Sequence, residues 1–333
     1  MQAQITDSLK NNPSEDVSPE AESTAEIPAW KRVSLVHDLD HYQTVADSLV
    51  FSPDSKLLLS GGASNDSYIT FWSVKKGQEL DYTRAQRTAV LAMAISPDGK
   101  TLLSGGEDAG LNVWDWRTGE YQATFLEHSK SITSLAISPD SKILITGGLD
   151  GLKVWDLAYS PQRPTYTLAN MGTLTNVVAM NPNGYIVASG NDRGKVLFWN
   201  LQTGTKISDF MPHSDMVTGL AFSPDGKTLI TASYDRTIKI WDLQSGQLLN
   251  TLTGHKDLIR AIALHPDGNV LASAGNDGII LWDLTNAQEL TKIKKHRNWV
   301  QSLAFSPDGQ YLASGGYDFT VKIWQSLTPS TNE

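Results

Sequence analysis

The 333-residue sequence contains no cysteine, which excludes disulfides, thiolate nucleophiles and cysteine-based metal sites. No run approaches the roughly 18 apolar residues that are needed to cross a bilayer. Residues 1–30 are polar and acidic, without the basic start and apolar run of a signal peptide. These absences predict a soluble cytoplasmic protein that does not insert into membranes.

The sequence also has no excess of basic residues: it contains 27 Lys and Arg residues and 36 Asp and Glu residues, which gives a net charge of -9. A protein that binds phosphate backbones needs a basic face, so no nucleic-acid partner is expected. Neither a Walker-type phosphate loop nor a His-Glu-x-x-His motif occurs. The Asp-rich turns lack the alternating ligand spacing of a calcium loop. The sequence therefore predicts no cofactor and no metal.

What the sequence does contain is a sevenfold internal repeat. Tryptophans recur at spacings of 42, 41, 44, 42, 41 and 42 residues, at Trp72, Trp114, Trp155, Trp199, Trp241, Trp282 and Trp324. A Ser-Pro-Asp turn or a close variant recurs in phase, at 52–54, 96–98, 138–140, 181–183, 223–225, 265–267 and 306–308. Periods of this length indicate a solenoid, a propeller or an array.

The fifth repeat shows what one unit contains. Met216–Phe222 is rich in β-formers, and Ser223–Gly226 is a tight turn in which proline presets φ and glycine can take a positive φ. Thr228–Ala232, Thr237–Trp241 and Gln247–Leu252 follow as three more strands. Four short strands in every 40–45 residues, as an approximate rule, are typical of a propeller blade.

The Trp-Asp pairs that end third strands, together with Gly254-His255, resemble the WD-repeat family over residues 31–324; the pairs stand at 114–115, 155–156, 241–242 and 282–283. The resemblance implies an all-β, seven-bladed propeller of four-stranded antiparallel blades. It also implies that a hydrogen-bonded set of His, Ser or Thr, Asp and Trp holds each blade. The matching sets are His128, Thr146, Asp150 and Trp155; His213, Thr231, Asp235 and Trp241; His255, Ser273, Asp277 and Trp282; and His296, Ser314, Asp318 and Trp324.

These sets contain the residue types of a hydrolase triad. Four copies at equivalent positions indicate a framework, because an enzyme needs one site, so no catalytic residue is predicted. Gln86 and Met171 stand at the His position of blades two and four, and His41 is out of register in blade one, where two extra residues precede Asp66. We therefore expect weaker polar contacts in blades one, two and four.

Only nine residues follow Trp324, so the last blade lacks a fourth strand from its own end. Lys31–Val36 is a β-rich run before the first blade and is expected to close the ring there, which removes free sheet edges. We expect a disordered acidic tail over 1–29, the propeller over 30–326 and a short tail over 327–333. Residues 1–29 carry six acidic residues and one lysine, a net charge of -5.

The repeat offsets place large side chains of blades five to seven on one face, and Trp, Tyr and Arg dominate binding hot spots. The predicted partner-binding residues are Met216, Tyr234, Leu258, Arg260, Trp299 and Tyr317. The predicted function is a non-catalytic scaffold that binds a protein or peptide there, as a monomeric propeller within a larger complex. The alternative is an enzyme or small-molecule sensor that uses the central channel, which requires one asymmetric polar cluster on the channel wall.

Overall fold

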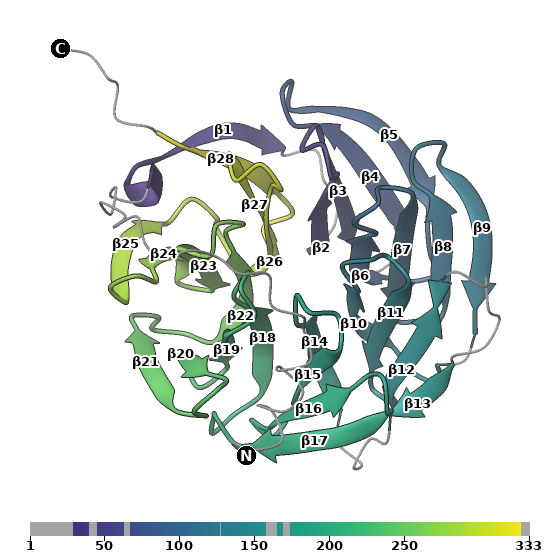
Figure 1. The fold of residues 1–333 in the computed structure, drawn as a ribbon. Helices are drawn as coiled ribbons and strands as arrows, with labels where there is room; N and C mark the ends of the chain where they lie inside the picture. The colour runs from purple at the N-terminus through teal and green to yellow at the C-terminus, as the bar shows by residue number, and fades with distance from the viewer. Residues whose placement is uncertain are drawn as a thin grey trace, which may run out of the picture.

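The computed structural model describes residues 29–39, 45–62, 67–126, 128–157, 165–168 and 174–327. Seven four-stranded antiparallel sheets form a ring (Figure 1), which confirms the predicted seven-bladed all-β fold. The expected tails fall outside the described residues, except for Ala29 and Leu327 at their inner ends.

Each blade runs from an inner strand at the ring axis to an outer strand at the rim. The inner strands are β2 (Ala46–Phe51), β6 (Val90–Ile95), β10 (Ile132–Ile137), β14 (Thr175–Met180), β18 (Val217–Phe222), β22 (Ile259–Leu264) and β26 (Val300–Phe305). The second strands are β3 (Leu57–Gly62), β7 (Thr101–Gly106), β11 (Ile143–Gly148), β15 (Ile186–Asn191), β19 (Thr228–Ser233), β23 (Val270–Gly275) and β27 (Tyr311–Gly316).

The third and outer strands complete the blades. The third strands are β4 (Tyr68–Ser73), β8 (Leu111–Asp115), β12 (Gly151–Asp156), β16 (Val196–Asn200), β20 (Thr237–Asp242), β24 (Gly278–Asp283) and β28 (Val321–Ser326). The outer strands are β5 (Gln78–Arg84), β9 (Glu120–Phe125), β13 (Tyr166–Leu168), β17 (Thr205–Phe210), β21 (Leu248–Thr253), β25 (Gln288–Ile293) and β1 (Val33–Leu39). One 3₁₀ turn, η1 (Ala29–Lys31), precedes β1.

The Ser-Pro-Asp turns have the chemistry that their sequence predicts. Ser223 Oγ donates to Asp225 Oδ1 at 2.5 Å and accepts the Thr228 N–H at 3.0 Å, so one hydroxyl ties the turn together. Gly226 has φ +68°, the left-handed region in which glycine is favoured. The turn thereby fixes where the inner strand ends and the second begins.

Each inner strand bulges at its second residue, where its pairing with the second strand shifts register. A bulge redirects a side chain out of the regular ladder. The seven bulge residues are Asp47, Leu91, Thr133, Asn176, Thr218, Arg260 and Gln301. The propeller therefore carries a ring of seven equivalent side chains around its axis, and their chemistry differs from blade to blade.

The ring closes as predicted, by an N-terminal strand in the last blade. β1 pairs antiparallel with β28, from Val33 opposite Ser326 to Leu39 opposite Val321. The strand lies slightly later in the chain than the expected Lys31–Val36. Trp30, 2% exposed, packs edge-on against Phe305 at a centroid distance of 5.0 Å and anchors the segment that leads into β1.

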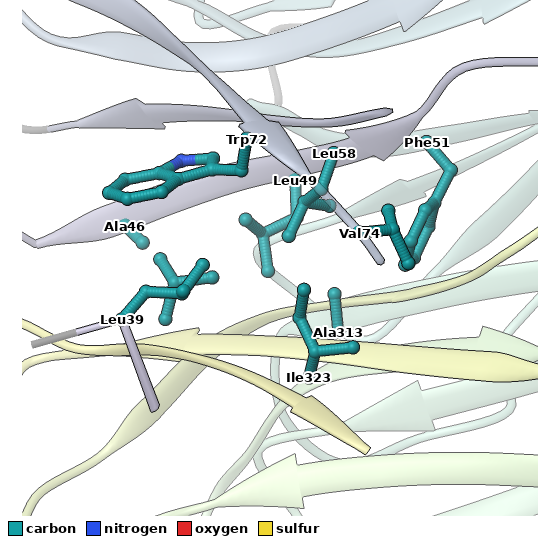
Figure 2. Close-up of a cluster of buried hydrophobic side chains, with 10 residues drawn as sticks. Leu39, Ala46, Leu49, Phe51, Leu58, Trp72, Val74, Ala313 and Ile323 are labelled. Carbon is teal, nitrogen blue, oxygen red and sulfur yellow. The ribbon is translucent and has the colours of Figure 1, made fainter. Parts of the chain in front are cut away.

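A hydrophobic core seals the seam between the last blade and the first. Figure 2 shows Leu39, Ala313 and Ile323 of the last blade facing side chains of β2, β3 and β4. The first-blade side chains are Ala46, Leu49, Phe51, Leu58, Trp72 and Val74. The Ser302 hydroxyl also donates to the Ala46 carbonyl at 2.7 Å, so a polar bond supplements the apolar packing across the seam.

Candidate functional site

The polar sets that were expected to hold the blades are present. In blade five, His213 Nδ1 is 2.8 Å from Asp235 Oδ2, and His213 Nε2 is 2.8 Å from Thr231 Oγ1. Trp241 Nε1 donates to the same hydroxyl at 3.2 Å. Blades three, six and seven repeat the arrangement around His128, His255 and His296.

The electrostatics of these sets suit a framework. Burial lowers the pKa of His213 more than the charge of Asp235 raises it, so the imidazole is neutral at neutral pH. Burial opposes the charge of Asp235, but hydrogen bonds from Thr237 and His213 outweigh it and hold its pKa below the usual range. Thr231, which would be the nucleophile of a triad, has no exposed surface. Such a hydroxyl stabilises the blade and cannot reach a substrate.

Blade two replaces the histidine with another polar network. Gln86 Nε2 donates to the Ser104 carbonyl at 2.9 Å, and Asn112 Nδ2 donates to Gln86 Oε1 at 3.0 Å. Trp114 Nε1 still donates to Ser104 Oγ, at 3.1 Å. Blade two therefore keeps a buried polar network, in which two amide side chains take the place of the missing histidine, and Asp108 at the Asp position accepts the Arg87 N–H at 2.9 Å. His41, Asp66 and Met171 lie outside the described residues.

A polar and aromatic cluster surrounds Arg260, the bulge residue of blade six. Its guanidinium carbon lies 4.1 Å from the centre of the Trp299 ring, 5.5 Å from that of Tyr234 and 5.8 Å from that of Tyr317. Arg260 Nη1 donates to Tyr234 Oη at 3.2 Å and to Gln301 Oε1 at 3.3 Å. We call these five residues the Arg260 cluster.

The cluster comes from three consecutive blades, as the repeat offsets predicted. Tyr234 follows β19 of blade five, Arg260 lies on β22 of blade six, and Trp299 and Tyr317 flank strands of blade seven. Trp299 and Tyr317 meet edge to face, with ring centres 5.7 Å apart. Cation–π contacts and aromatic packing of this kind fix the guanidinium in place.

The other two predicted residues, Met216 and Leu258, each lie one residue before an inner strand and are half-buried. The Met216 carbonyl accepts the Tyr234 N–H at 3.0 Å, a backbone link to the cluster. The structure thus joins four of the six predicted residues through their side chains and a fifth through its backbone.

A cavity of about 210 Å³ lies beside the cluster, among the inner strands. Asp47, Thr218, Arg260 and Gln301, four of the seven bulge residues, line it. Asp47 Oδ2 is buried and accepts no hydrogen bond. The pKa of Asp47 is raised to about 7, because burial and the charge of Glu107 raise it more than the charge of Arg260 lowers it. The cavity is therefore lined by the carboxyl group of Asp47, of which one oxygen accepts no hydrogen bond, and by the guanidinium group of Arg260, which packs against aromatic rings.

Six segments of the chain match the WD40 family, described as "WD domain, G-beta repeat": residues 34–73, 78–115, 119–156, 204–242, 246–283 and 287–325. The chain belongs to the WD40 repeat family. The unmatched stretch between the third and fourth segments, residues 157–203, contains β14, β15 and β16 of blade four, and β17 of the same blade lies in the fourth segment.

This WD40 propeller is also similar to Autophagy-related protein 16 from Arabidopsis thaliana, with 24% identity over 178 residues. The match covers 52% of this chain and 34% of that protein, so the chain spans about a third of its relative's length.

Two features are absent from the described part of the WD40 propeller. No helix there is long and apolar enough to cross a membrane. Within the same residues, no group of three or more His, Cys, Asp or Glu side chains is arranged to hold a metal ion.

Sequence reasoning missed Asp47, although a signal for it exists. Each bulge residue stands five positions before the first residue of its Ser-Pro-Asp turn or turn variant, as Arg260 stands before His265. Counting back from the turn at Ser52 gives Asp47. Counting forward from the histidine position failed because the first repeat is irregular around His41.

Proposed function

We propose that this WD40 propeller is a non-catalytic scaffold that binds a segment of a partner protein over the Arg260 cluster. The observation that carries the proposal is the guanidinium of Arg260, held among aromatic rings of blades five and seven beside a cavity at the axis. Binding hot spots are enriched in Trp, Tyr and Arg and lie near the centre of an interface. All four charged or aromatic residues of the cluster are only half-buried, so a partner can cover them.

Pre-organisation supports the proposal. A free arginine side chain loses rotamer freedom when a partner binds, which costs about 0.5–1.5 kcal/mol. Arg260 is already fixed by ring contacts and by hydrogen bonds to Tyr234 and Gln301. The remaining N–H groups of its guanidinium can then bind a partner carboxylate or carbonyl with little further ordering.

The asymmetric polar cluster that a small-molecule sensor would require is present, since Asp47, Arg260 and Gln301 differ from the other bulge residues. Size argues against a small-molecule site. Cavities for drug-sized ligands measure about 300–1,000 Å³, whereas this one measures about 210 Å³. It suits one inserted side chain of a protein partner better than a whole metabolite.

The test is affinity capture from the native cell followed by binding measurements on the purified partner. Trp299→Ala and Arg260→Ala should each weaken binding by about 1–3 kcal/mol, within the hot-spot range. Tyr185→Ala is the matched control, because Tyr185 is an exposed aromatic of blade four. Glu107 is unsuitable as a control, since its charge acts on Asp47. Unchanged partner binding by both cluster variants would refute the proposal.

We further propose that the propeller acts in the cytoplasm as a monomer within a larger complex. The acidic net charge of -9 and the absence of cysteine support that setting. Size-exclusion chromatography with light scattering on the purified chain checks the oligomeric state, and a dimer would contradict it.

A further inference from the structure

Blade two carries a second cavity, separate from the Arg260 cluster and with a volume of about 640 Å³. Its wall includes Arg84, the last residue of β5, and Arg87 from the segment after that strand, together with Tyr121 of β9 and Leu126, the residue after β9. Asn112 of β8 also lines it. This volume lies within the usual range of ligand-binding pockets, about 300–1,000 Å³.

The other repeats show why this cavity is open. The position two residues before the repeat tryptophan is lysine in blades three, five and seven, at Lys153, Lys239 and Lys322. In blade five, Lys239 Nζ donates to the carbonyl of the residue before the histidine, Pro212, at 2.6 Å. In blade two, the much shorter Asn112 makes the equivalent bond to the Ala85 carbonyl. The space that a lysine stem would occupy is left open.

The cavity has a rigid inner wall. A chain of hydrogen bonds runs from Tyr121 Oη to Thr124 Oγ1 at 2.7 Å, on to Asn112 Oδ1, and from Asn112 Nδ2 to Gln86 Oε1 at 3.0 Å. Tyr121 also packs edge to face on Trp114, with ring centres 5.4 Å apart. Because these side chains are already tied to one another, a ligand would not have to order them.

The outer wall combines positive charge with exposed apolar surface. Arg84 and Arg87 are exposed, and neither forms an ion pair with any residue that the structure describes. The one acid of the wall, Asp108, uses its carboxylate to accept the Arg87 and Gly110 N–H groups. Tyr121 is 55% exposed and Leu126 73% exposed. In a chain of net charge -9, this is a locally cationic and partly apolar site.

We infer that the blade-two cavity binds a peptide segment of a partner protein in which acidic side chains flank a large apolar one. The carboxylates pair with Arg84 and Arg87, and the apolar side chain lies against Tyr121 and Leu126. Arginine matches carboxylate geometry with paired N–H donors, which favours an acidic ligand over a neutral one. The site is independent of the Arg260 cluster, so either proposal can fail without the other.

The probe is the acetylated, amidated pentapeptide Asp-Glu-Leu-Phe-Glu, titrated calorimetrically into the full-length chain at low salt. We expect saturable binding of this peptide, no measurable binding of Lys-Lys-Leu-Phe-Lys, and much weaker binding of Asp-Glu-Gly-Gly-Glu. Changing Arg84→Glu and Arg87→Glu together should weaken binding about tenfold or more, since two charge pairs become repulsions. Arg193→Glu, an exposed arginine of blade four, is the matched charge control and should have little effect.

Asn112→Lys is the sharpest variant, because it introduces the residue that blades three, five and seven carry at the same position. It should abolish peptide binding while leaving the thermal transition cooperative. Retained binding in Asn112→Lys, or an equal loss in Arg193→Glu, would overturn the inference. A further variant tests whether the N-terminal segment competes for the cavity: in it, the six acidic residues of 1–29 are changed to the corresponding amides. Much tighter peptide binding by that chain would assign the cavity to the protein's own N-terminal segment instead of a partner.

Discussion

The guanidinium of Arg260 lies 4.1 Å from the centre of the Trp299 ring, across the junction between blades six and seven. Arg260 is a bulge residue of β22, and Trp299 precedes β26 by one residue. The bulge directs the arginine out of its own sheet, and the next blade supplies the ring on which it packs. The contact therefore links two repeats, because blade six supplies the arginine and blade seven supplies the aromatic ring.

The two side chains should be energetically coupled in the folded protein. In a double-mutant cycle of Arg260→Ala and Trp299→Ala, we expect a coupling free energy of unfolding of about 0.5–2 kcal/mol, the range of a partly desolvated cation–π pair. Urea unfolding of the wild type, both single variants and the double variant measures it. Strictly additive effects would show that the contact does not stabilise the fold.

Asp47 should make the protein less stable as the pH rises. Its folded pKa is about 7 against an ordinary value of 3.8, because burial and Glu107 disfavour the charged form more than Arg260 favours it. As the pH rises, Asp47 loses its proton at a lower pH in the unfolded chain than in the folded one. The resulting loss of folding free energy is therefore absent below pH 3.8 and complete above about pH 7.

The charged and titratable neighbours that act on this carboxyl are Glu107, Arg260 and Tyr317. Asp47→Asn should therefore raise the urea midpoint at pH 8 and leave it nearly unchanged at pH 4. An increase of the same size at both pH values would show that ionisation of Asp47 is not the cause.

The buried polar sets should be costly to break. Asp235→Ala and Asp277→Ala should each lower the free energy of unfolding by about 2–4 kcal/mol, since each leaves a buried histidine without its acceptor. Denaturant unfolding measures both. Asp66→Ala, in the irregular first repeat, is expected to cost clearly less. A larger loss for Asp66→Ala would show that the alignment of blade one is wrong.

The N-terminal strand should be required for folding, whereas the segment before it should not. Deleting residues 1–28 is expected to leave the melting temperature nearly unchanged. Deleting residues 1–39 removes Trp30 and all of β1, which exposes β28 and should cause aggregation or severe destabilisation. Calorimetry and light scattering on the two truncated chains measure the difference. Equal stability of the two would contradict closure by β1.

The period of the repeat made the fold predictable from the sequence. Trp241 and Ser223 recur in phase because every blade needs the same turn and the same indole donor. The face of the Arg260 cluster was predictable for the same reason, since equal offsets in a repeat place residues on one side of the ring. Partner binding at that face remains a proposal.

Other features could not be predicted, because they depend on pairs of residues that change together. Gln86 stands where other blades have a histidine, which by itself predicts fewer polar contacts. Asn112, 26 residues later, donates a hydrogen bond to Gln86 and completes a buried polar network. No single position shows that compensation. The raised pKa of Asp47 likewise depends on Glu107 and Arg260, which lie on two other blades, and the tertiary structure alone brings these charges together.

The pairing of β1 with β28 also determines how the ring responds to mechanical force. Val33 lies opposite Ser326, so both chain ends leave the sheet at the same end of the strand pair. Tension applied between the two termini would peel these strands apart, breaking their hydrogen bonds one after another instead of shearing them all at once. The closing strand is therefore the element that yields first under pulling, ahead of the six blades whose four strands are continuous in the chain.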